Sequence, residues 1–254
     1  MAISIDIGAS NIRIAKVSNG KVKGKQKVST PKTKKEILSL LINLIYEYKD
    51  KKIICIGIAG FVKDNKIYAT PNMDFNNMNI KKLLEKKFDC KVYIDNDANC
   101  AGLGELYYGH GKGKKNFVLF TLGTGIGGAI IIENKLYRGT GFAGEPGHML
   151  INNKMFEKIA SGKYYQELLN KNHNKNKIIN EISENLAIGI LNVSYILDPE
   201  IIILGGGFSE LKGLVKKVKE KFNNKNIIKR NIPVIHAKLG DNAGLIGASL
   251  LYKK

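Results

Sequence analysis

Three glycine turns each follow an apolar run that is typical of a β-strand, at residues 8, 123–128 and 205–207. Such turns expose backbone N–H groups, and these groups can hold a phosphate. One glycine turn after a strand is common, but three at the start, middle and end of one chain predict a nucleotide bound between two lobes. The chain has no G-x-x-x-x-G-K-[ST] motif and no complete G-x-G-x-x-G opening a helix in a first βαβ unit. These observations argue against a P-loop enzyme and a dinucleotide-binding fold.

The elements that must position these turns alternate along the chain. β-Branched and apolar runs predict strands at residues 3–7, 12–17, 53–58, 91–94, 117–122, 128–132, 200–204 and 233–237. Helical periodicity predicts helices at residues 34–48, 80–88, 100–108, 178–197, 211–222 and 243–252. The glycine- and lysine-rich stretch 109–115 is expected to cross between two lobes. This alternation predicts an α/β fold with mixed sheets flanked by helices.

The charge of the chain first suggests a nucleic-acid partner. The 254 residues include 41 basic and 22 acidic side chains, a net charge of +19. Only three of the basic residues are arginine, however, and the lysines are scattered along the chain. Arginine is the side chain that forks onto phosphates and base edges. We therefore interpret the charge as a solvated basic surface with no nucleic-acid partner, which can still attract an anionic small substrate.

Cysteine usage and hydropathy indicate the compartment. Cys55, Cys90 and Cys100 are odd in number and lack C-x-x-C spacing, which predicts thiols in a reducing compartment. No signal peptide opens the chain, and no apolar run approaches the roughly 18 residues of a membrane span. We therefore expect a cytoplasmic protein with no membrane partner.

Six motifs follow one another over residues 3–250: Asp6–Asn11, Asn96–Asn99, Leu122–Gly128, Gly139–His148, Asp198–Gly207 and Asp241–Ala248. Together they resemble the ROK family of sugar kinases, within the superfamily that includes actin and heat-shock chaperones. The resemblance implies a two-lobed actin-like ATPase fold, related to ribonuclease H. Residues 1–110 would form a small N-terminal lobe on which helix 243–254 packs back, and residues 111–242 a large lobe, with the active-site cleft between them.

The resemblance also implies roles for individual residues. Asp97 takes the place of the catalytic base that accepts the proton of a sugar hydroxyl. The implied sugar-binding residues are Asn96, Asp97, Glu145, His148 and Glu157. The implied nucleotide-binding residues are Asp6, Gly8, Ser10, Asn11, Gly123, Thr124, Gly125, Gly127, Gly205, Gly206 and Gly207. Asp6 would also hold Mg²⁺ through water, and Ala9 places a methyl group where the family usually has a second glycine.

Several of these residues also have a purely structural interpretation. Asp97 could cap the helix expected to begin near Cys100, and Asp6 could close an Asx turn. His148 could be a packed loop histidine. Asp95 falls one residue before the matched motif and is interpreted as an edge or surface charge. Many family members carry a cysteine-rich zinc site before the position of Glu157, but this chain has no cysteine there, so no structural zinc is expected.

The resemblance implies an ATP- and Mg²⁺-dependent hexose kinase of the glucokinase type, with the 6-hydroxyl of glucose as the expected acceptor. The alternatives are an N-acetylhexosamine or fructose kinase, a polyphosphate-dependent glucokinase, and a non-enzyme, either a sugar-binding pseudokinase or a regulator. The family's repressors need an N-terminal helix-turn-helix domain, whereas the first phosphate strand here begins at Ile3. Family members are often dimers, so a homodimer is expected by analogy.

Overall fold

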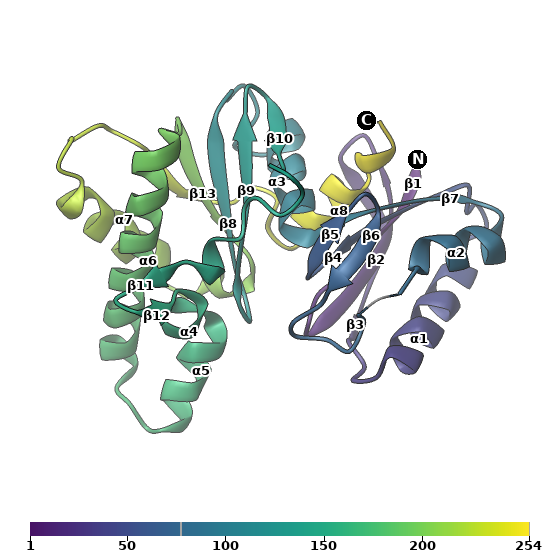
Figure 1. Ribbon diagram of the computed structural model, residues 1–254, viewed down its shortest axis with the longest axis horizontal. Helices are drawn as coiled ribbons and strands as arrows, with labels where there is room; N and C mark the ends of the chain where they lie inside the picture. The colour runs from purple at the N-terminus through teal and green to yellow at the C-terminus, as the bar shows by residue number, and fades with distance from the viewer. Residues whose placement is uncertain (77, 254) are drawn as a thin grey trace. The chain divides into compact units, whose positions relative to one another are not determined.

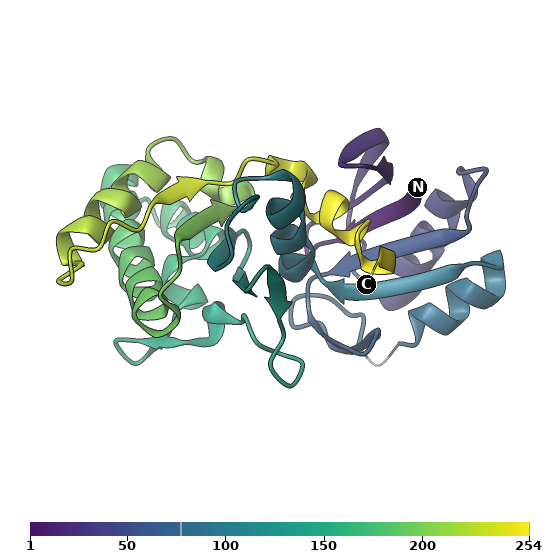
Figure 2. The same cartoon turned by 90° about the horizontal axis from the view of Figure 1, so that it is seen from above.

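The computed structural model describes residues 1–76 and 78–253. The chain packs as two compact units (Figures 1 and 2). Unit 1 comprises Met1–Tyr108, Arg138–Phe142 and Asn242–Lys254, and unit 2 comprises Gly109–Tyr137 and Ala143–Asp241. The lobe boundaries expected from the sequence stay a prediction. In the structure the segment Arg138–Phe142 packs in unit 1.

Unit 1 is built on a mixed sheet with the strand order β3-β2-β1-β4-β7. Its strands are β1 (Ala2–Ile7), β2 (Asn11–Ser18), β3 (Lys21–Ser29), β4 (Ile53–Ile58) and β7 (Lys91–Asn96). β1 is antiparallel to β2, and β2 to β3, whereas β1, β4 and β7 are parallel. The parallel strands therefore end at one edge of the sheet, and Asp6 and Asn96 lie at these ends.

The two faces of this sheet differ because side chains alternate along each strand. One set of isoleucines packs in a core with helices α1 (Lys34–Tyr46) and α2 (Ile80–Phe88): Ile3, Ile5, Ile7, Ile54, Ile56 and Ile58. The intervening positions include the small residues Ser4 and Gly57, and Gly57 lies against Asp97 and Cys100 of α3 (Asp97–Tyr108). This second face therefore accommodates α3 and α8 (Ala243–Ala248), and Asp6 lies on it.

Helices α3 and α8 pack so closely that one position requires glycine. A Cβ atom added to Gly247 would lie 1.5 Å from the carbonyl oxygen of Cys100. The close approach places α8 beside β1 and β4, next to the end of β1 where Asp6 lies.

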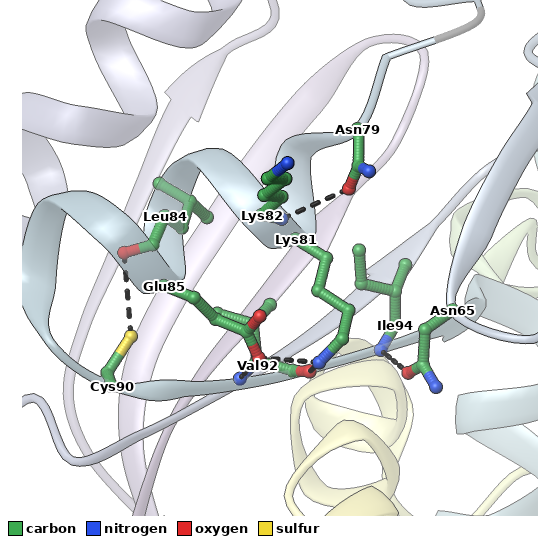
Figure 3. Close-up of polar contacts among 9 residues, drawn as sticks. All are labelled: Asn65, Asn79, Lys81, Lys82, Leu84, Glu85, Cys90, Val92 and Ile94. Carbon is green, nitrogen blue, oxygen red and sulfur yellow. Dashed lines mark hydrogen bonds and ion pairs between the residues drawn. The ribbon is translucent and has the colours of Figure 1, made fainter.

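The free edge of β7 has its backbone groups bonded by side chains (Figure 3). The N–H of Val92 donates to Glu85 Oε1 at 3.1 Å, and Lys81 Nζ donates to the Val92 carbonyl at 2.7 Å. The N–H of Ile94 donates to Oδ1 of Asn65 at 2.8 Å, in the turn between β5 (Phe61–Lys63) and β6 (Lys66–Ala69). These bonds satisfy the backbone groups of β7 upstream of the candidate site and leave this edge poorly suited to pairing with another strand.

Unit 2 contains a second mixed sheet, in the order β10-β9-β8-β13-β14. Its strands are β8 (Phe117–Leu122), β9 (Ile126–Ile132), β10 (Lys135–Tyr137), β13 (Ile201–Gly205) and β14 (Val234–His236). β8 is antiparallel to β9, and β9 to β10, whereas β8, β13 and β14 are parallel. The order of strand directions is the same as in unit 1, so the turns after β1 and β8 occupy corresponding positions.

The helices of unit 2 share an apolar core with one face of its sheet. They are α4 (Glu157–Ala160), α5 (Gly162–Asn170), α6 (Lys175–Leu197) and α7 (Leu214–Lys225). Phe120 and Leu204 of the sheet pack in this core with Ile182, Ile190 and Phe222 of α6 and α7. No helix in the part of the chain that the structure describes is long and apolar enough to cross a membrane.

The predicted α/β class with mixed sheets is confirmed, and several elements differ from the prediction. The gap between the predicted strand 91–94 and the predicted helix 100–108 is wrong, because β7 runs through Asn96 and α3 begins at Asp97. The exposed strand β3 was not predicted, since its lysines hide the alternation of Val22 and Val28. The Asn19–Gly20 turn before it has positive φ angles, 48° and 74°, and is a hairpin signal that the sequence offers. Other elements without a prediction are β5, β6, β10, α4, α5, and the short β11 (Leu150–Ile151) and β12 (Lys154–Met155).

The variant Gly247→Ala should destabilise unit 1, because the new methyl group forces α8 away from α3. Overpacking of this kind costs about 1–3 kcal/mol and more where backbone is the neighbour. The measurement is urea unfolding followed by circular dichroism. Gly207→Ala is the control, since a Cβ there meets no atom within 4 Å. Equal midpoints for the two variants would contradict the close packing of α3 and α8.

Candidate active site

Asp97 is a partly buried residue at the first position of α3, directly after β7. Burial, followed by the nearby carboxylate of Asp6, raises its pKa to about 7, although the Arg13 guanidinium acts in the opposite direction. One pKa unit corresponds to about 1.4 kcal/mol. The favourable dipole at a helix N-terminus contributes about 0.3–1 kcal/mol and therefore offsets less than one unit. The site thus holds a carboxyl group that changes its charge near neutral pH.

Asn96, and not Asp97, is the cap of α3. The N–H of Asn99 donates to Asn96 Oδ1 at 3.0 Å, which satisfies a backbone donor of the first helical turn. Asn96 Nδ2 donates to the carbonyl of Gly60 at 3.0 Å. The carboxylate of Asp97 accepts from the adjacent Ala98 N–H, at 2.9 Å, and from its own backbone N–H, and neither bond reaches the N2 or N3 donors that a helix cap satisfies. Its interpretation as the helix cap is therefore wrong.

Asp6 is held by a neighbouring strand and by α8. Asp6 and Arg13 are directly opposite on β1 and β2, and Arg13 Nη1 lies 3.2 Å from Asp6 Oδ2. On the other side, a Cβ added to Gly244 would lie only 3.1–3.3 Å from the Asp6 carboxylate atoms. Arg13 and Gly244 were not among the predicted site residues. The opposite charge at Arg13 is visible in the sequence, but its pairing depends on the register of β1 and β2.

The turn after β1 is a compact backbone loop. The N–H of Gly8 donates to the carbonyl of Asn11 at 3.0 Å. Thr30 fixes the loop from outside, because its hydroxyl donates to the Gly8 carbonyl at 2.7 Å and its N–H to the Ser10 carbonyl at 3.1 Å. Gly8, Ser10 and Asn11 are therefore close to Asp6 within unit 1, as their motif implies.

The glycine turns of unit 2 lie side by side. A Cβ on Gly206, which has a φ of 84°, would lie 2.4 Å from the Leu122 carbonyl oxygen at the end of β8. In the turn after β8, a Cβ on Gly125 would lie 2.5 Å from Glu157 Oε2 at the start of α4. The structure thus brings three segments of unit 2 together. They are the start of α4 at Glu157, the turn after β8 with the predicted nucleotide-binding residues Gly123, Thr124, Gly125 and Gly127, and the turn Gly205–Gly207.

Glu145 and His148 flank a short helical turn, Pro146–His148, that packs on β9. A Cβ on Gly147 would lie 2.2 Å from the Ile126 carbonyl oxygen, so the backbone there lies directly against the strand. Glu145 is half-buried and His148 is exposed. The segment that follows forms the small β11–β12 hairpin.

The interpretation of Asp95 as a surface charge is wrong. Asp95 lies on the edge strand β7, but it is only 5% exposed and forms an ion pair with Arg138. Neither residue was a predicted site residue, and their pairing joins positions 43 residues apart in the sequence. No pattern in the sequence signals this contact.

The titration of Asp97 predicts a pH-dependent effect on stability. The pKa is about 7 in the folded state and lower, about 3.9, in the unfolded chain, so folding is penalised as pH rises from about 4 to about 7. Asp97→Asn removes this penalty. We expect the variant to exceed the wild type in free energy of unfolding by about 1–3 kcal/mol at pH 8, less than the full pKa difference would give, because Asp97 is only partly buried and solvent screens its charge. The difference should vanish toward pH 4.

Urea unfolding at several pH values measures this difference, and Asp89→Asn, an exposed position in the same unit, is the control. A constant difference between pH 4 and pH 8 would show that Asp97 does not titrate in this range.

Comparisons with known proteins agree with this architecture. The profile described as the ROK family matches residues 2–254. An uncharacterized protein of Clostridium perfringens is 34% identical, over 86% of this chain and 85% of its own. The glucokinase of Streptomyces coelicolor is 28% identical, over 100% of this chain and 98% of its own. A xylose repressor of Caldicellulosiruptor bescii is 29% identical, over 96% of this chain and 76% of its own.

Among solved structures, a ROK family glucokinase from Streptomyces griseus in complex with glucose and AMPPNP superposes with a TM-score of 0.89. It is 27% identical, and the likeness covers 100% of this chain and 99% of that one. The predicted actin-like ATPase fold is thereby confirmed. Because the family profile spans nearly the whole chain, this protein belongs to the ROK family.

Proposed function

We propose that this protein is a sugar kinase that transfers the γ-phosphoryl group of ATP to a hexose hydroxyl, with Asp97 as the general base. The observation that carries the proposal is the Asp97 carboxyl group, whose pKa is raised to about 7 by burial and by Asp6. General bases work best when their pKa lies near the operating pH. The glucokinases among the relatives support the same activity.

In the proposed reaction, Asp97 accepts the proton of the sugar hydroxyl as its oxygen attacks the γ-phosphorus of ATP. The bond from this phosphorus to the bridging oxygen breaks, and ADP leaves with the electron pair. Asn96, Glu145, His148 and Glu157 would hold the sugar, since its hydroxyl groups both donate and accept hydrogen bonds.

The phosphates would be held by the glycine turns. We assign Gly8, Ser10 and Asn11 in unit 1 to this role. In unit 2 the assigned residues are Gly123, Thr124, Gly125, Gly127, Gly205, Gly206 and Gly207.

Magnesium fits the donor set at Asp6. Among residues 1–76 and 78–253, no group of three or more His, Cys, Asp and Glu side chains is placed to hold a metal ion. Mg²⁺ does not need such a group, because it is usually bound by one or two carboxylates together with substrate phosphates and water. We propose that Asp6 holds the ion through water, where it would neutralise charge on the phosphates.

Glucose, with transfer to its 6-hydroxyl, is the proposed substrate. An N-acetylhexosamine, fructose, and polyphosphate as the donor are the alternatives. The second candidate function is a sugar-binding regulator without catalysis, which the xylose repressor among the relatives favours. ATP consumption with glucose separates the kinase from the regulator.

A coupled assay with a panel of hexoses and with ATP or polyphosphate tests the proposal. The wild type should phosphorylate glucose, and Asp97→Asn should lower kcat by about 10²–10⁴-fold because the proton acceptor is lost. Glucose affinity, measured by calorimetry, should change little. Asp89→Asn is the control for loss of one negative charge. Full activity of the Asp97 variant would refute the assigned base, and sugar binding without ATP consumption by the wild type would favour the regulator.

Gly244→Ala should disturb phosphoryl transfer through Asp6. The added methyl group would displace the Asp6 carboxylate by a few tenths of an ångström. Misplacement on this scale is expected to lower kcat about 10-fold. Alanine is the better helix former, so the melting temperature should not fall through helix propensity. Unchanged kcat in a folded variant would argue against a role for Asp6.

A further inference from the structure

The segment Arg138–Phe142, here called the strap, packs in unit 1 although the residues on both sides of it belong to unit 2. The strap follows β10 and leads directly into the loop that carries Glu145 and His148.

The first anchor of the strap is an ion pair between Arg138 and Asp95. The Arg138 guanidinium bonds Asp95 Oδ2, and the Asp95 side chain is 7% exposed against 35% for Arg138. The other carboxylate oxygen, Oδ1, accepts the N–H of Asn96 at 2.8 Å and Nδ2 of Asn99 at 3.0 Å. Asp95 thus connects the strap to the backbone and first helical turn that carry Asp97.

Two further contacts hold the strap. The Phe142 ring makes edge-to-face contacts with Phe61 and Tyr68, at centroid distances of 5.7 Å and 5.6 Å. Gly141, with a φ of 141°, lies against the Lys63 side chain, and a Cβ there would come within 2.7 Å of it. All three partners belong to the β5–β6 hairpin, whose preceding residue Gly60 accepts the bond from Asn96 Nδ2 at 3.0 Å.

Removal of Arg138 would take away the positive charge that is paired with the buried Asp95 carboxylate. Loss of one member of a buried ion pair is costly, because the other charge stays buried. The Asp95 side chain can then turn toward the open cavity of about 420 Å³ that borders Arg138 and β7. Such a turn weakens the bonds to Asn96 and Asn99, and with them the orientation of Asp97.

We infer that Asp95 and Arg138 are positioning residues. Their ion pair fixes the junction of β7 and α3 at Asn96 and Asp97, here called the corner, and holds the strap against it. Loss of the ion pair should therefore slow phosphoryl transfer. The inference rests on the proposed function. Neither residue is assigned to contact the sugar, the nucleotide or the transferred group.

The test compares Arg138→Met with Lys81→Met. Lys81 forms an ion pair with Glu85 at 2.5 Å and bonds the same strand β7 at Val92, upstream of the candidate site (Figure 3). Arg138→Met should lower kcat/KM for the sugar about 10- to 100-fold, with the KM for ATP changed less than about 3-fold. Lys81→Met should retain kcat/KM within about 2-fold, assayed well below both melting temperatures.

Two further variants separate positioning from simple destabilisation. Arg138→Lys keeps the charge and should recover most of the lost kcat/KM. Asp95→Asn keeps a side-chain oxygen that can accept from Asn96 and Asn99. The double variant Asp95→Asn with Arg138→Met should have a kcat/KM no lower than that of Arg138→Met alone, since the two residues act as a unit. Wild-type kcat/KM in Arg138→Met, or additive losses in the double variant, would overturn the inference.

Hydrogen exchange gives a readout that does not depend on activity. In Arg138→Met the amides of Asn96 and of residues 139–142 should exchange at least about 10-fold faster than in the wild type, and in Lys81→Met they should not. If the wild type phosphorylates no sugar, the proposed function fails while this measurement still decides the positioning role. Unchanged exchange in Arg138→Met would overturn that role, whatever the activity.

Discussion

The burial of the Asp97 carboxyl group, with the carboxylate of Asp6 nearby, is the constraint that the packing of unit 1 maintains at the candidate site. Two negative charges in a partly desolvated place are unfavourable, and the protein responds in two ways: the pKa of Asp97 is raised to about 7, and Arg13 pairs with Asp6. The arrangement persists because packing imposes it. Gly57 lets α3 approach β4, Gly247 lets α8 approach α3, and Gly244 leaves room for the Asp6 carboxylate. An unfavourable electrostatic pair maintained by glycine contacts is typical of a functional site rather than of a stabilising core.

The same order of strand directions occurs in both sheets, and this repetition explains where the glycine turns lie. In each unit the first strand turns back sharply into an antiparallel neighbour, at Gly8 after β1 and at Gly123–Gly125 after β8. The parallel strand beside it, β4 or β13, also leads into a glycine, Gly60 or Gly206. A Cβ at either position would lie 2.4 Å from a backbone carbonyl oxygen, of Ala69 or Leu122. Two copies of one topology thus place a glycine turn after the first strand of each sheet and a closely packed glycine after the parallel strand beside it.

The corner at Asn96 and Asp97 is held by polar contacts from several directions. Asn96 caps α3 and bonds Gly60, while Asp95 ties the same backbone to Asn99 and to the strap. Upstream, the outer edge of β7 is bonded by Lys81, Glu85 and Asn65, so its backbone groups at Val92 and Ile94 have hydrogen-bond partners. A general base needs a fixed orientation, and the short side chains of Asn96 and Asp95, bonded to the backbone, provide it with little loss of side-chain entropy.

Local patterns in the sequence determined the longer helices, most strands of the two sheets, the glycine motifs and the family. Helix α2 runs over the predicted residues 80–88, because apolar periodicity is a property of neighbouring residues. The tertiary structure alone decided which polar residues are buried and what they bond. In the sequence Asp95 has the pattern of a surface charge, whereas in the fold it is buried and paired with Arg138, 43 residues away. Asn96 rather than Asp97 caps α3 because β7 extends two residues beyond the predicted strand. The pKa of Asp97 is raised first by burial and then by Asp6, which the parallel pairing of β1, β4 and β7 places nearby. Both causes depend on residues that are remote in the sequence and close only in the fold.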